Sequence, residues 1–382
     1  MKLLIIHNFY VIDGGENKRV HEDIELLERN DIEVKLFSSN NIQNKLKNIF
    51  YVLISPFNIF AYFKLSKLIK DFNPDVIHVH NTWYRMGFMV YLVLKKQSIP
   101  VFQTLHNLRF FCANALMYRN NSDCDLCLTS KFYSVKYNCY KNRIVSMVSS
   151  FNNYLILKSK VFISNNFWFF SPNPYVSSLL SKQLQIDKNK ILNFPNYVED
   201  FQSVKPDRSF KLENYLLIVS RSSSEKGVKE FLNIWKELNT HINLVIVGGS
   251  QETVNISSDK IKFFSNISVN KLAYLYQNCF AVVIPSTWKE GFPRVIIESS
   301  SVNKPVILSE NIEISKLEEI KEFSFTFNIK KGNDFKQALE NVEQKLKNGE
   351  IDSRNWYEKY YTEEKYMSYL LESFKKAVEI NK

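Results

Sequence analysis

The hydrophobic pattern of the chain alternates between short strand-like runs and longer segments of helical periodicity. The first run, Lys2–Ile6, is followed by Gly14 and Gly15 and then by Glu16–Arg29, whose apolar residues recur at helical spacing. A strand, a glycine turn and a helix in this order form the opening unit of a doubly wound α/β domain. The two glycines do not form the G-x-G-x-x-G pattern, so a dinucleotide fingerprint is absent.

The same alternation continues along both halves of the chain. Polar residues from Glu199 to Glu213 form the best linker in the sequence. We therefore predict an α/β protein with two domains, residues 1–200 and 201–382, and one long final helix at about residues 355–380. The other predicted strands are Val34–Phe37, Val76–His80, Pro100–Thr104, Val161–Ser164, Ile191–Phe194, Tyr215–Val219, Leu244–Val247, Ile261–Phe264, Phe280–Ile284 and Pro305–Leu308.

Length and composition agree with this picture. The 382 residues suffice for two or three domains, and 45% apolar with 23% charged residues is typical of a globular, soluble-type chain. The best candidate for a membrane span, Ile49–Phe63, is too short and is interrupted by Pro56. The N-terminus resembles a first strand rather than a signal peptide, so we expect a cytoplasmic location.

The net charge of +11 is concentrated in the first half, where residues 1–200 carry 24 Lys and Arg against 15 Asp and Glu. Within this half, residues 41–70 hold five lysines, no acid and many large apolar residues. Such a stretch fits two structures. One is a peripheral contact with the anionic inner face of the cell membrane, and the other is a core helix pair with a lysine-coated outer face. No nucleic-acid-binding motif accompanies the charge, so we predict no nucleic-acid partner.

Four of the five cysteines lie close together in the sequence. Cys112, Cys124, Cys127 and Cys139 fall within 28 positions and include one C-x-x-C pair. In a chain expected to be cytoplasmic, such clustering indicates metal or redox use rather than structural disulfides. Four thiolates could form a tetrahedral structural zinc site that fixes a long loop. The alternative is a set of small buried apolar side chains.

Two histidines and an arginine follow predicted strands of the first half. His80 ends one strand, His106 follows the next, and Arg109 comes three residues later. In open α/β sheets ligands collect beyond the carboxyl ends of the strands. These three residues are therefore candidates for contact with a substrate hydroxyl or an anion. The alternative for each histidine is a structural hydrogen-bond donor in the core.

Two cations flank a serine turn in the second half. Arg221 and Lys226 lie between the predicted strand Tyr215–Val219 and the helix that follows it. Two cations together with free amides at a helix N-terminus are suited to a diphosphate. The alternative is a capped turn with solvated charges.

Two carboxylates stand eight positions apart further on, Glu290 in a turn after a buried strand and Glu298 in the helix that follows. The amides of Gly291 and Phe292 are expected to point outward at the N-terminus of that helix. These carboxylates can accept hydrogen bonds from sugar and ribose hydroxyls, whereas two anions would repel a phosphate. The alternative is a pair of solvated carboxylates, of which the one at the helix start is favoured by the helix dipole.

The order and spacing of these motifs resemble a known family. The second half contains V-S-R-S-S-S-E-K-G (Val219–Gly227), V-G-G (Val247–Gly249) and E-G-F-P-R-V-I-I-E (Glu290–Glu298). The first half adds Gly14-Gly15, D-V-I-H-V-H, T-L-H-N and F-P-N-Y-V-E-D. Together they are similar to retaining glycosyltransferases of family 4 (glycosyl transferases group 1), in particular to a subgroup that builds bacterial surface polysaccharides such as capsules. The resemblance implies the GT-B fold, in which two Rossmann-like, doubly wound domains face a cleft.

The resemblance also implies roles for the candidate residues. The N-terminal domain would hold a saccharide or lipid-linked acceptor and the C-terminal domain a nucleotide-sugar donor, and the final helix would cross back onto the N-terminal domain. Implied catalytic roles fall on His106, Arg221, Lys226 and Glu290. Implied donor-binding roles fall on Gly14, Gly15, Gly248, Gly291, Phe292, Pro293 and Glu298, and acceptor-side roles on His80 and Arg109. One departure is Ser220, which replaces the family's usual glycine without removing a charged group.

The chemistry of transfer fits these residues. Breaking a sugar–phosphate bond places negative charge on the departing diphosphate, which Arg221 and Lys226 could stabilise. We therefore expect metal-independent catalysis with no catalytic cofactor. The route implied by the family is front-face transfer with retention, in which the leaving phosphate takes the acceptor proton. The rival hypothesis is a non-catalytic nucleotide-sugar-binding or membrane scaffold protein of a polysaccharide assembly.

Overall fold

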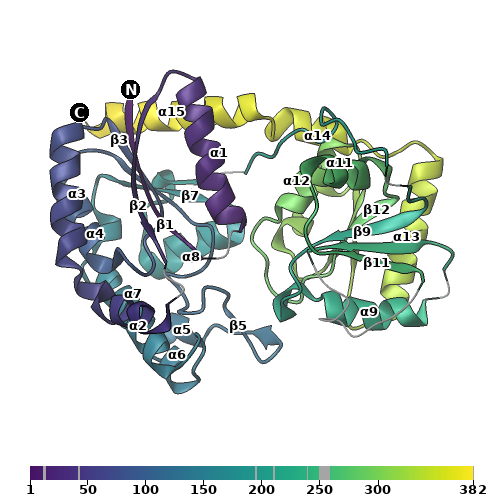
Figure 1. Ribbon diagram of the computed structural model, residues 1–382, viewed down its shortest axis with the longest axis horizontal. Helices are drawn as coiled ribbons and strands as arrows, with labels where there is room; N and C mark the ends of the chain where they lie inside the picture. Colours follow the sequence, from purple (N-terminus) through teal and green to yellow (C-terminus); the bar gives the residue numbers. More distant parts are fainter. Residues whose placement is uncertain are drawn as a thin grey trace. The chain divides into compact units, whose positions relative to one another are not determined.

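The structure is a computed structural model, and it describes the chain except for residues 12–13, 42–43, 194–195, 210, 239, 249–258 and 382. The chain forms two compact units, each built on a parallel β-sheet (Figure 1). The N-terminal unit consists of Met1–Arg119, Cys124–Phe194 and Met367–Lys382. The C-terminal unit consists of Asn120–Asp123 and Pro195–Tyr366. The division between the halves thus lies at 194/195, whereas the sequence suggested 200/201.

The sheet of the N-terminal unit has six parallel strands in the order β2-β1-β3-β4-β7-β8, with helices on either side (Figure 1). The strands are β1 (Lys2–Phe9), β2 (Glu33–Asn40), β3 (Val76–Asn81), β4 (Val101–Thr104), β7 (Phe167–Ser171) and β8 (Ile191–Asn193). The longer helices are α1 (Gly15–Arg29), α2 (Lys45–Ile54), α3 (Ile59–Phe72), α4 (Gly87–Lys95), α7 (Arg143–Lys158) and α8 (Pro174–Leu184). The short elements are η1 (Ser55–Phe57), β5 (Tyr118–Arg119), β6 (Ser122–Asp123), α5 (Leu126–Thr129), α6 (Tyr133–Lys136), η2 (Val161–Ile163) and η3 (Lys188–Lys190).

Strand β1 shows why this sheet forms. Its residues 3–6 are two leucines and two isoleucines, and all four are completely buried. Burial on both faces is the pattern of a parallel strand covered by helices. In the register of the sheet, Leu4 lies beside Lys35 of β2 and Ile77 of β3. The residues that follow β1, β3 and β4 therefore leave the sheet at the same edge.

One predicted strand of this unit is wrong. The segment Val161–Ile163 forms the 3-10 helix η2, and the strand of this region is β7, which begins at Phe167. Lys160, which precedes η2, has a left-handed backbone conformation with φ of 53°, and the chain turns there before the strand. All of β7 is buried, so its aromatic residues show none of the alternation that marks a half-exposed strand.

The C-terminal unit has a second six-stranded parallel sheet, in the order β11-β10-β9-β12-β13-β14. This is the strand order of dinucleotide-binding Rossmann domains, and it reverses between β9 and β12. The five strands predicted here are confirmed, and β14 was not predicted. The strands are β9 (Tyr215–Val219), β10 (Asn243–Val247), β11 (Ile261–Phe264), β12 (Ala281–Ile284), β13 (Val306–Ser309) and β14 (Ser324–Phe327). The helices are η4 (Ser224–Lys226), α9 (Val228–Glu237), α11 (Val269–Asn278), α12 (Arg294–Ser301), η5 (Glu313–Lys316), η6 (Glu318–Ile320), α13 (Gly332–Lys347) and α14 (Ser353–Tyr360).

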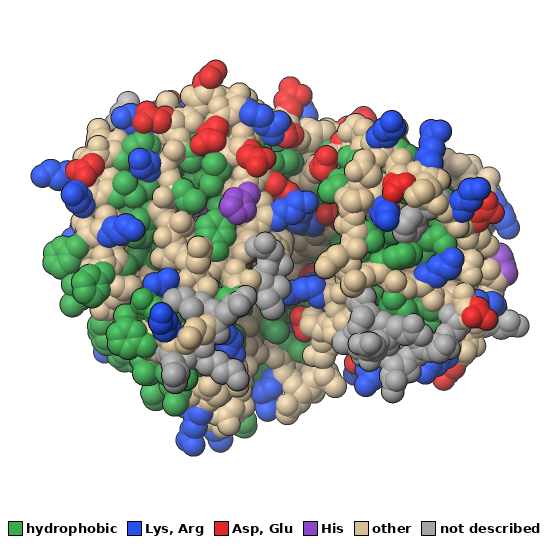
Figure 2. Space-filling view, in the orientation of Figure 1, with side chains coloured by type: hydrophobic (Ala, Val, Ile, Leu, Met, Phe, Trp, Pro, Cys, Tyr) green, Lys and Arg blue, Asp and Glu red, His purple; other side chains and the backbone are tan. Residues whose placement is uncertain are grey.

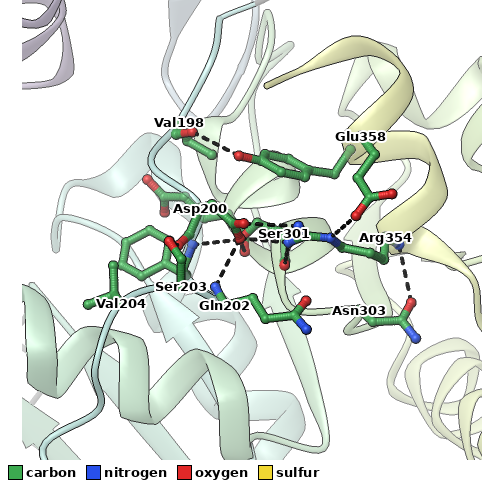
Figure 3. Close-up of polar contacts among 12 residues, drawn as sticks. Val198, Asp200, Gln202, Ser203, Val204, Ser301, Asn303, Arg354 and Glu358 are labelled. Carbon is green, nitrogen blue, oxygen red and sulfur yellow. Dashed lines mark hydrogen bonds and ion pairs between the residues drawn. The ribbon is translucent and has the colours of Figure 1, made fainter. Parts of the chain in front are cut away.

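An ion pair holds the start of the predicted linker within the C-terminal unit (Figure 3). Asp200 and Arg354 form a bidentate pair, with Oδ1–Nη1 and Oδ2–Nη2 distances of 2.6 and 2.9 Å. Arg354 Nη1 also donates to the carbonyl of Ser301, and Tyr357 Oη donates to the carbonyl of Val198 at 3.3 Å. These contacts fasten the segment around residue 200 to α12 and α14. This is why the C-terminal unit begins before residue 200.

The single final helix expected from the sequence is two helices. α14 ends at Tyr360, and α15 (Glu363–Asn381) begins after a break of two residues. Tyr361 in the break is buried against Trp356, with 4.2 Å between ring centroids. Thr362 Oγ1 accepts a hydrogen bond from the amide of Lys365 at 3.3 Å, as an N-cap residue does. A buried aromatic ring and a threonine cap therefore separate the two helices.

Most of α15 belongs to the N-terminal unit, which includes Met367–Lys382. Phe374 of this helix is completely buried. Its ring lies 4.8 Å from that of Phe102 on β4 and 5.8 Å from that of His78 on β3. The end of the chain thus contributes to the core of the unit in which the chain begins.

In the described part of the chain, no single helix is both long and apolar enough to cross a membrane. One pair of helical arms, Ile49–Phe57 and Ile59–Phe72, passes that test only when the two are taken together, and they are bent by 60°.

Candidate functional site

The carboxyl ends of β9 and β12 bring two charged residues together in the C-terminal unit. The two strands are parallel neighbours, so the segments that follow them leave the sheet at the same edge. Lys226 ends η4, after β9, and its Nζ forms an ion pair with Oε1 of Glu290, which follows β12. The two side chains are only 18% and 10% exposed. Residues 64 positions apart, both predicted for one site, are therefore in contact.

Neighbouring hydrogen bonds fix this pair. Ser286 Oγ donates to Oε2 of Glu290, and Ser309 Oγ donates to the carbonyl of Ser286. The amide of Thr287 donates to the carbonyl of Glu225 at 3.0 Å, which links the loop after β12 to η4. Both carboxylate oxygens of Glu290 thus have partners, one an ammonium group and the other a hydroxyl group.

Glycine is required directly after Lys226. Gly227 has a φ of +67°, in the left-handed region, and a Cβ at this position would lie 1.9 Å from the carbonyl oxygen of Pro285. The loops that carry Lys226 and Glu290 can approach each other only because residue 227 has no side chain.

Gly248 and Arg221 extend the same edge of the sheet. Gly248 follows β10, has a φ of +91°, and would place a Cβ 2.8 Å from the carbonyl oxygen of Ser220. It therefore packs against the backbone that leads into Arg221. Arg221 is exposed, and its guanidinium makes no hydrogen bond or ion pair with any residue that the structure describes. Gly249, the second glycine of the V-G-G motif, lies outside the described residues.

The residues after Glu290 lead directly into α12. This helix starts at Arg294, its N-cap is Pro293, and no side chain caps it. Gly291 and Phe292 therefore immediately precede its first turn, as the sequence predicted. The ring of Phe292 also packs against Tyr361, with 5.6 Å between centroids.

Glu298 lies within α12 and has its own partners. Tyr276 Oη, on α11, donates to Oε2 of Glu298 at 2.5 Å, and Arg294 Nε lies 4.0 Å from Oε1. Burial, together with the carboxylate, raises the pKa of Tyr276 well above its ordinary value, so the phenol remains a donor. The contacts described for Glu298 are thus with α11 and α12, and not with the loop that carries Lys226.

In the N-terminal unit, a row of buried polar side chains crosses the carboxyl end of the sheet. Arg19 and Asp23 on α1 form a salt bridge of 2.7 Å, and their side chains are 3% and 1% exposed. Asp23 Oδ2 lies 3.9 Å from Nε2 of His80, and His80 Nδ1 lies 2.9 Å from Nε2 of His106. The two histidines predicted for this edge are therefore in contact. The Asp23 carboxylate favours a proton on Nε2 of His80, so that its Nδ1 accepts a hydrogen bond from His106.

Burial keeps three histidines of this edge neutral. Desolvation lowers the pKa of His78 to about 3 and the pKa of His7 to about 4. The pKa of His80 is also lowered well below its ordinary value, chiefly by burial and further by the neighbouring histidines. His78 Nε2 lies 2.7 Å from Thr104 Oγ1, and His7 Nε2 lies 3.2 Å from Asn17 Oδ1. At pH 7 these three imidazoles therefore act through hydrogen bonds and carry no charge.

Glu16, in the first turn of α1, lies beside the T-L-H-N segment. Asn107 Nδ2 donates a hydrogen bond to Oε2 of Glu16 at 3.1 Å. Burial raises the pKa of Glu16 to about 7, although Arg109 and Asn107 act in the opposite direction. This edge of the sheet therefore holds a carboxyl group that titrates near neutrality.

Arg109 is packed among aromatic rings and is only partly exposed. Its guanidinium lies 5.5 Å from the ring of Trp83 and 5.0 Å from that of Tyr140, and its Nη1 donates to the carbonyl of Ala113 at 2.9 Å. A cavity of about 30 Å³ lies beside it, with His80 and His106 in its wall. Such a volume has room for one or two water molecules and not for a saccharide.

Gly14 and Gly15 begin α1, with Gly15 as the first helical residue and Gly14 as an N-cap that lacks a side chain. A Cβ on Gly14 would meet none of the described atoms within 4 Å. Packing within the described chain therefore does not require glycine at position 14.

The clustered cysteines lie near one another. Cys112 and Cys127 are both buried, and a hydrogen bond between their sulfurs lowers the pKa of Cys112 to about 6 and raises that of Cys127. Burial raises the pKa of Cys139, and Cys112 and Cys124 raise it further. Among the residues that the structure describes, no group of three or more His, Cys, Asp or Glu side chains is placed to hold a metal ion. The structural zinc site stays a prediction, which metal analysis of the purified protein would test.

Sequence reasoning missed several residues that the structure places at these two edges: His7, Glu16, Asn17, Arg19, Asp23, His78, Tyr276 and Ser286. For the residues of α1, the sequence did contain a pattern that could have identified them. Arg19 and Asp23 are four residues apart, and the helix that carries them follows directly after the glycine pair. For Tyr276 no such signal exists, because its partner lies 22 positions further along the chain.

Comparison with known proteins agrees with the division of the chain into two units. Residues 200–364 match the family model described as Glycosyl transferases group 1. Residues 13–135 match the model described as Glycosyltransferase Family 4. The two matches together span most of the chain.

Two curated relatives align over part of their length. The O-antigen chain mannosyltransferase RfbU of Salmonella typhimurium is 31% identical over 144 residues, which are 35% of this chain and 40% of the relative. The N,N'-diacetylbacillosaminyl-diphospho-undecaprenol alpha-1,3-N-acetylgalactosaminyltransferase of Campylobacter jejuni is 34% identical over 128 residues. That alignment covers 31% of this chain and 32% of the relative. The chain therefore aligns with less than half the length of either relative.

Solved structures align over almost the whole chain. Sucrose-phosphate synthase from Thermosynechococcus elongatus superposes with a TM-score of 0.70 at 14% identity and covers 98% of each chain. HepE of Anabaena, in complex with UDP and glucose, superposes with a TM-score of 0.63 at 14% identity, over 98% of this chain and 100% of its own. The chain has the GT-B fold predicted from its sequence, and each of its halves matches a glycosyltransferase family model.

Proposed function

We propose that the protein is a retaining glycosyltransferase that moves a sugar from a nucleotide-sugar donor to a lipid-linked saccharide acceptor in bacterial surface polysaccharide synthesis. The observation that carries this proposal is the Lys226–Glu290 ion pair at the carboxyl ends of β9 and β12. In parallel α/β sheets, ligands bind at this edge where the strand order reverses. A cation beside a carboxylate suits a ligand that carries both phosphate and hydroxyl groups.

In this proposal the donor diphosphate binds to Arg221 and Lys226. Arg221 offers an exposed guanidinium, and Lys226 offers an amine that Glu290 already positions. The missing side chain at Gly248 lets the donor approach the backbone beside Arg221. The donor-sugar hydroxyls bind at Glu290, Gly291, Phe292 and Pro293, and the ribose binds at Glu298.

The proposed reaction breaks the bond between the anomeric carbon and the diphosphate oxygen and forms a bond from that carbon to an acceptor hydroxyl oxygen. Negative charge grows on the departing diphosphate, where Arg221 and Lys226 stabilise it, so the route needs no metal ion. The acceptor proton passes to the departing phosphate on the same face of the sugar. Entry and departure on one face retain the anomeric configuration.

His106 is proposed to contact the transferred sugar, with Gly14 and Gly15 nearby on the donor side. His80 and Arg109 act on the acceptor side, His80 by orienting the imidazole of His106 through their 2.9 Å contact. A neutral His80 can orient its neighbour without adding a cation that would compete for the diphosphate.

The names of the relatives support the proposed acceptor. One relative is a mannosyltransferase of the O-antigen chain, and the other is named for transfer onto a diphospho-undecaprenol carrier. HepE, which has the same fold, was solved with UDP and glucose. We therefore propose a sugar carried on a polyprenyl diphosphate as the acceptor, and a cytoplasmic enzyme that works at the inner face of the cell membrane.

A thermal-shift panel of UDP-, GDP- and ADP-sugars tests the donor site. One nucleotide class is expected to raise the melting temperature, because a ligand present at 100 times its Kd adds about 2.7 kcal/mol of stability. Lys226→Ala should lose this shift. Lys229→Ala, which removes an exposed lysine three residues away on α9, should keep it. An unchanged shift in Lys226→Ala would remove this residue from the donor site.

Transfer assays with the stabilising donor then separate the two candidate functions. A glycosyltransferase should convert a polyprenyl diphosphate saccharide into a longer product. NMR of the new linkage should show the anomeric configuration of the donor, and an inverted product would disprove retention. Donor binding without hydrolysis or transfer would instead support a non-catalytic nucleotide-sugar-binding or scaffold protein.

A further inference from the structure

We propose that α2, η1, α3 and α7 of the N-terminal unit form one surface that lies on an anionic lipid bilayer. We call it the apolar surface and define it by nine exposed or partly exposed side chains. They are Phe50, Leu53, Phe57, Ile59, Phe60, Phe63, Ile144, Met147 and Phe151.

The first part of the apolar surface lies on α2, η1 and α3. Phe50 and Phe57 are 59% and 56% exposed, and Phe60 and Phe63 are 84% and 64% exposed. Single exposed apolar residues are ordinary on protein surfaces, but several large ones on adjoining helices indicate an interaction site. Figure 2 shows exposed hydrophobic side chains gathered with basic side chains over the region of α2 and α3, at the left and lower left of the view.

The second part lies on α7 and could not be recognised from the 41–70 segment alone. Ile144, Met147, Phe151 and Tyr154 recur at helical spacing, so they share one face of this helix. A helix normally buries such a stripe. Here Ile144 and Met147 are 51% and 47% exposed, and the helix buries a serine- and asparagine-rich face instead.

The two parts are continuous. The ring of Phe57 in η1 lies 5.9 Å from that of Phe151 on α7. Two segments almost a hundred positions apart in the sequence therefore form one apolar area. Neither segment is apolar enough by itself to indicate an interaction surface.

The segments that form the apolar surface are basic and carry one acid, the exposed Asp71 near the C-terminal end of α3. No Asp or Glu occurs between Glu33 and Asp71 or between Asp125 and Asp187. Lys64 and Lys67 are exposed on α3, and Lys141 and Arg143 are exposed at the start of α7. A large apolar surface flanked mainly by basic side chains complements anionic headgroups and the acyl boundary beneath them. A protein partner would more commonly meet a rim of mixed charges.

The packing of α3 and the bend at η1 favour a surface that lies on the membrane rather than one that spans it. α3 buries Ala61, Leu65 and Ile69 in the core of the N-terminal unit, and insertion would pull these residues out of that core. The bend of 60° between the arms around η1 also prevents a straight crossing. The helices can therefore sink their exposed faces into the interfacial layer while their inner faces stay packed.

The use of this surface rests on the proposed function, since a lipid-linked acceptor is presented at a membrane. Its existence can be tested separately with purified protein and vesicles of phosphatidylglycerol and phosphatidylcholine, without donor or acceptor. The wild-type protein should sediment with phosphatidylglycerol vesicles. Phe60→Ser with Phe63→Ser, and independently Ile144→Ser with Met147→Ser, should weaken this partitioning about tenfold or more, since aromatic and aliphatic burial drives it.

The charge arm of the experiment uses Lys64→Glu with Lys67→Glu. Each lysine near an anionic surface contributes about 1 kcal/mol, so this variant should bind phosphatidylglycerol vesicles at least about tenfold more weakly. Two matched controls lie in the C-terminal unit. Val269→Ser with Tyr360→Ser removes two apolar residues that are 42% and 38% exposed, close to the exposure of Ile144 and Met147. Lys236→Glu with Lys347→Glu reverses two exposed lysines. Both controls should bind as wild type does.

Three outcomes would overturn the proposal. The wild-type protein does not sediment with anionic vesicles, or the surface variants bind as well as the controls, or the serine variants convert a dimer into a monomer while vesicle binding is absent. The last result would assign the surface to a second copy of the chain.

Failure of the proposed function gives a different result. Vesicle binding would then be intact and sensitive to the surface variants, while no donor or transfer is found. If both proposals hold, Phe60→Ser with Phe63→Ser should slow transfer to an acceptor embedded in vesicles and leave transfer to a water-soluble acceptor unchanged.

Discussion

The two units place different chemistry at corresponding edges of similar sheets. The N-terminal unit holds five of the six histidines of the chain, and at the carboxyl end of its sheet three of them are buried and neutral. The C-terminal unit places the Lys226–Glu290 ion pair there, and the two side chains are 18% and 10% exposed. One edge thus offers hydrogen bonds without charge, and the other offers charge.

This difference follows from burial. A fully enclosed imidazole loses its proton because desolvation penalises the charged form, whereas a partly open amine and carboxylate can pair and still meet a ligand. A transferase that separates charge between a sugar and a diphosphate needs cations only on the diphosphate side. The comparison therefore predicts large catalytic effects in the C-terminal unit and effects of orientation or pH in the N-terminal unit.

The largest effect is expected from Lys226→Ala. Removing the amine should lower kcat about 100- to 1000-fold, because its charge is needed most when the diphosphate leaves. His80→Gln should lower kcat only about tenfold, since it removes an orienting contact and no charge. Steady-state kinetics of both variants with the identified donor would measure this difference. Equal losses in the two variants would contradict the comparison.

Acid should destabilise the N-terminal unit first. The pKa values of His78 and His7 are lowered to about 3 and about 4, so the native state keeps them neutral while the unfolded chain takes up protons below about pH 6.5. Their contribution to stability is thus complete above pH 6.5 and is lost as the pH falls. Between pH 7 and pH 4 we expect a loss of about 6 kcal/mol, roughly 3 kcal/mol from each histidine.

Urea unfolding of the full chain at several pH values, followed by hydrogen exchange of each unit, would measure this loss. His78→Asn should flatten the pH dependence. An identical acid response of the two units would contradict the assignment.

Gly227→Ala should destabilise the C-terminal unit by about 2–3 kcal/mol, because the added Cβ meets the carbonyl oxygen of Pro285 and the backbone has positive φ. Gly349→Ala is the matched control, since Gly349 has a φ of +68° and a Cβ there meets none of the described atoms within 4 Å. The control should be destabilised by only about 1 kcal/mol, because alanine is strained at a positive φ. Equal melting temperatures of the two variants would show that the two loops can separate freely.

The smallest effect concerns Glu16. Its pKa is raised to about 7, so the native state favours the protonated carboxyl, and stability falls as the pH rises from about 4.5 to about 7. Glu16→Gln keeps an acceptor for Asn107 and removes the ionisation. We expect this variant to be more stable than wild type by about 1–2 kcal/mol at pH 8 and similar to it at pH 4, as measured by thermal unfolding. A constant difference across this range would contradict the burial of this carboxyl.

Much of the fold could be predicted because it depends on local pattern. Short apolar runs between helical segments predicted the parallel strands of the C-terminal unit, and motif spacing predicted GT-B. The prediction failed where burial removed the pattern, as in the all-buried strand β7, or where one distant contact decided the outcome. Asp200 is fastened to the C-terminal unit by Arg354, 154 positions away. Nothing in the sequence near residue 200 shows this.

The candidate site shows the same division. The sequence identified Lys226 and Glu290 from motifs, and the structure brings them into contact. It could not show that Tyr276 occupies one oxygen of Glu298, or that Asp23 lies behind His80. Those partners depend on how helices pack on a sheet, which a linear motif does not encode.

By itself, the sequence determined the alternation of strands and helices, the two-domain fold and the charged residues at the ends of β9 and β12. These follow from periodicity and from short motifs. Only the tertiary structure showed which apolar residues of the basic segment 41–70 are buried and which are exposed. α3 buries Ala61, Leu65 and Ile69 and leaves Phe60 and Phe63 in solvent, and α7 extends the exposed area. The physical reason is that burial is a property of the packed chain: the same apolar residues fit a core or a surface until the sheet beneath them fixes which face is covered.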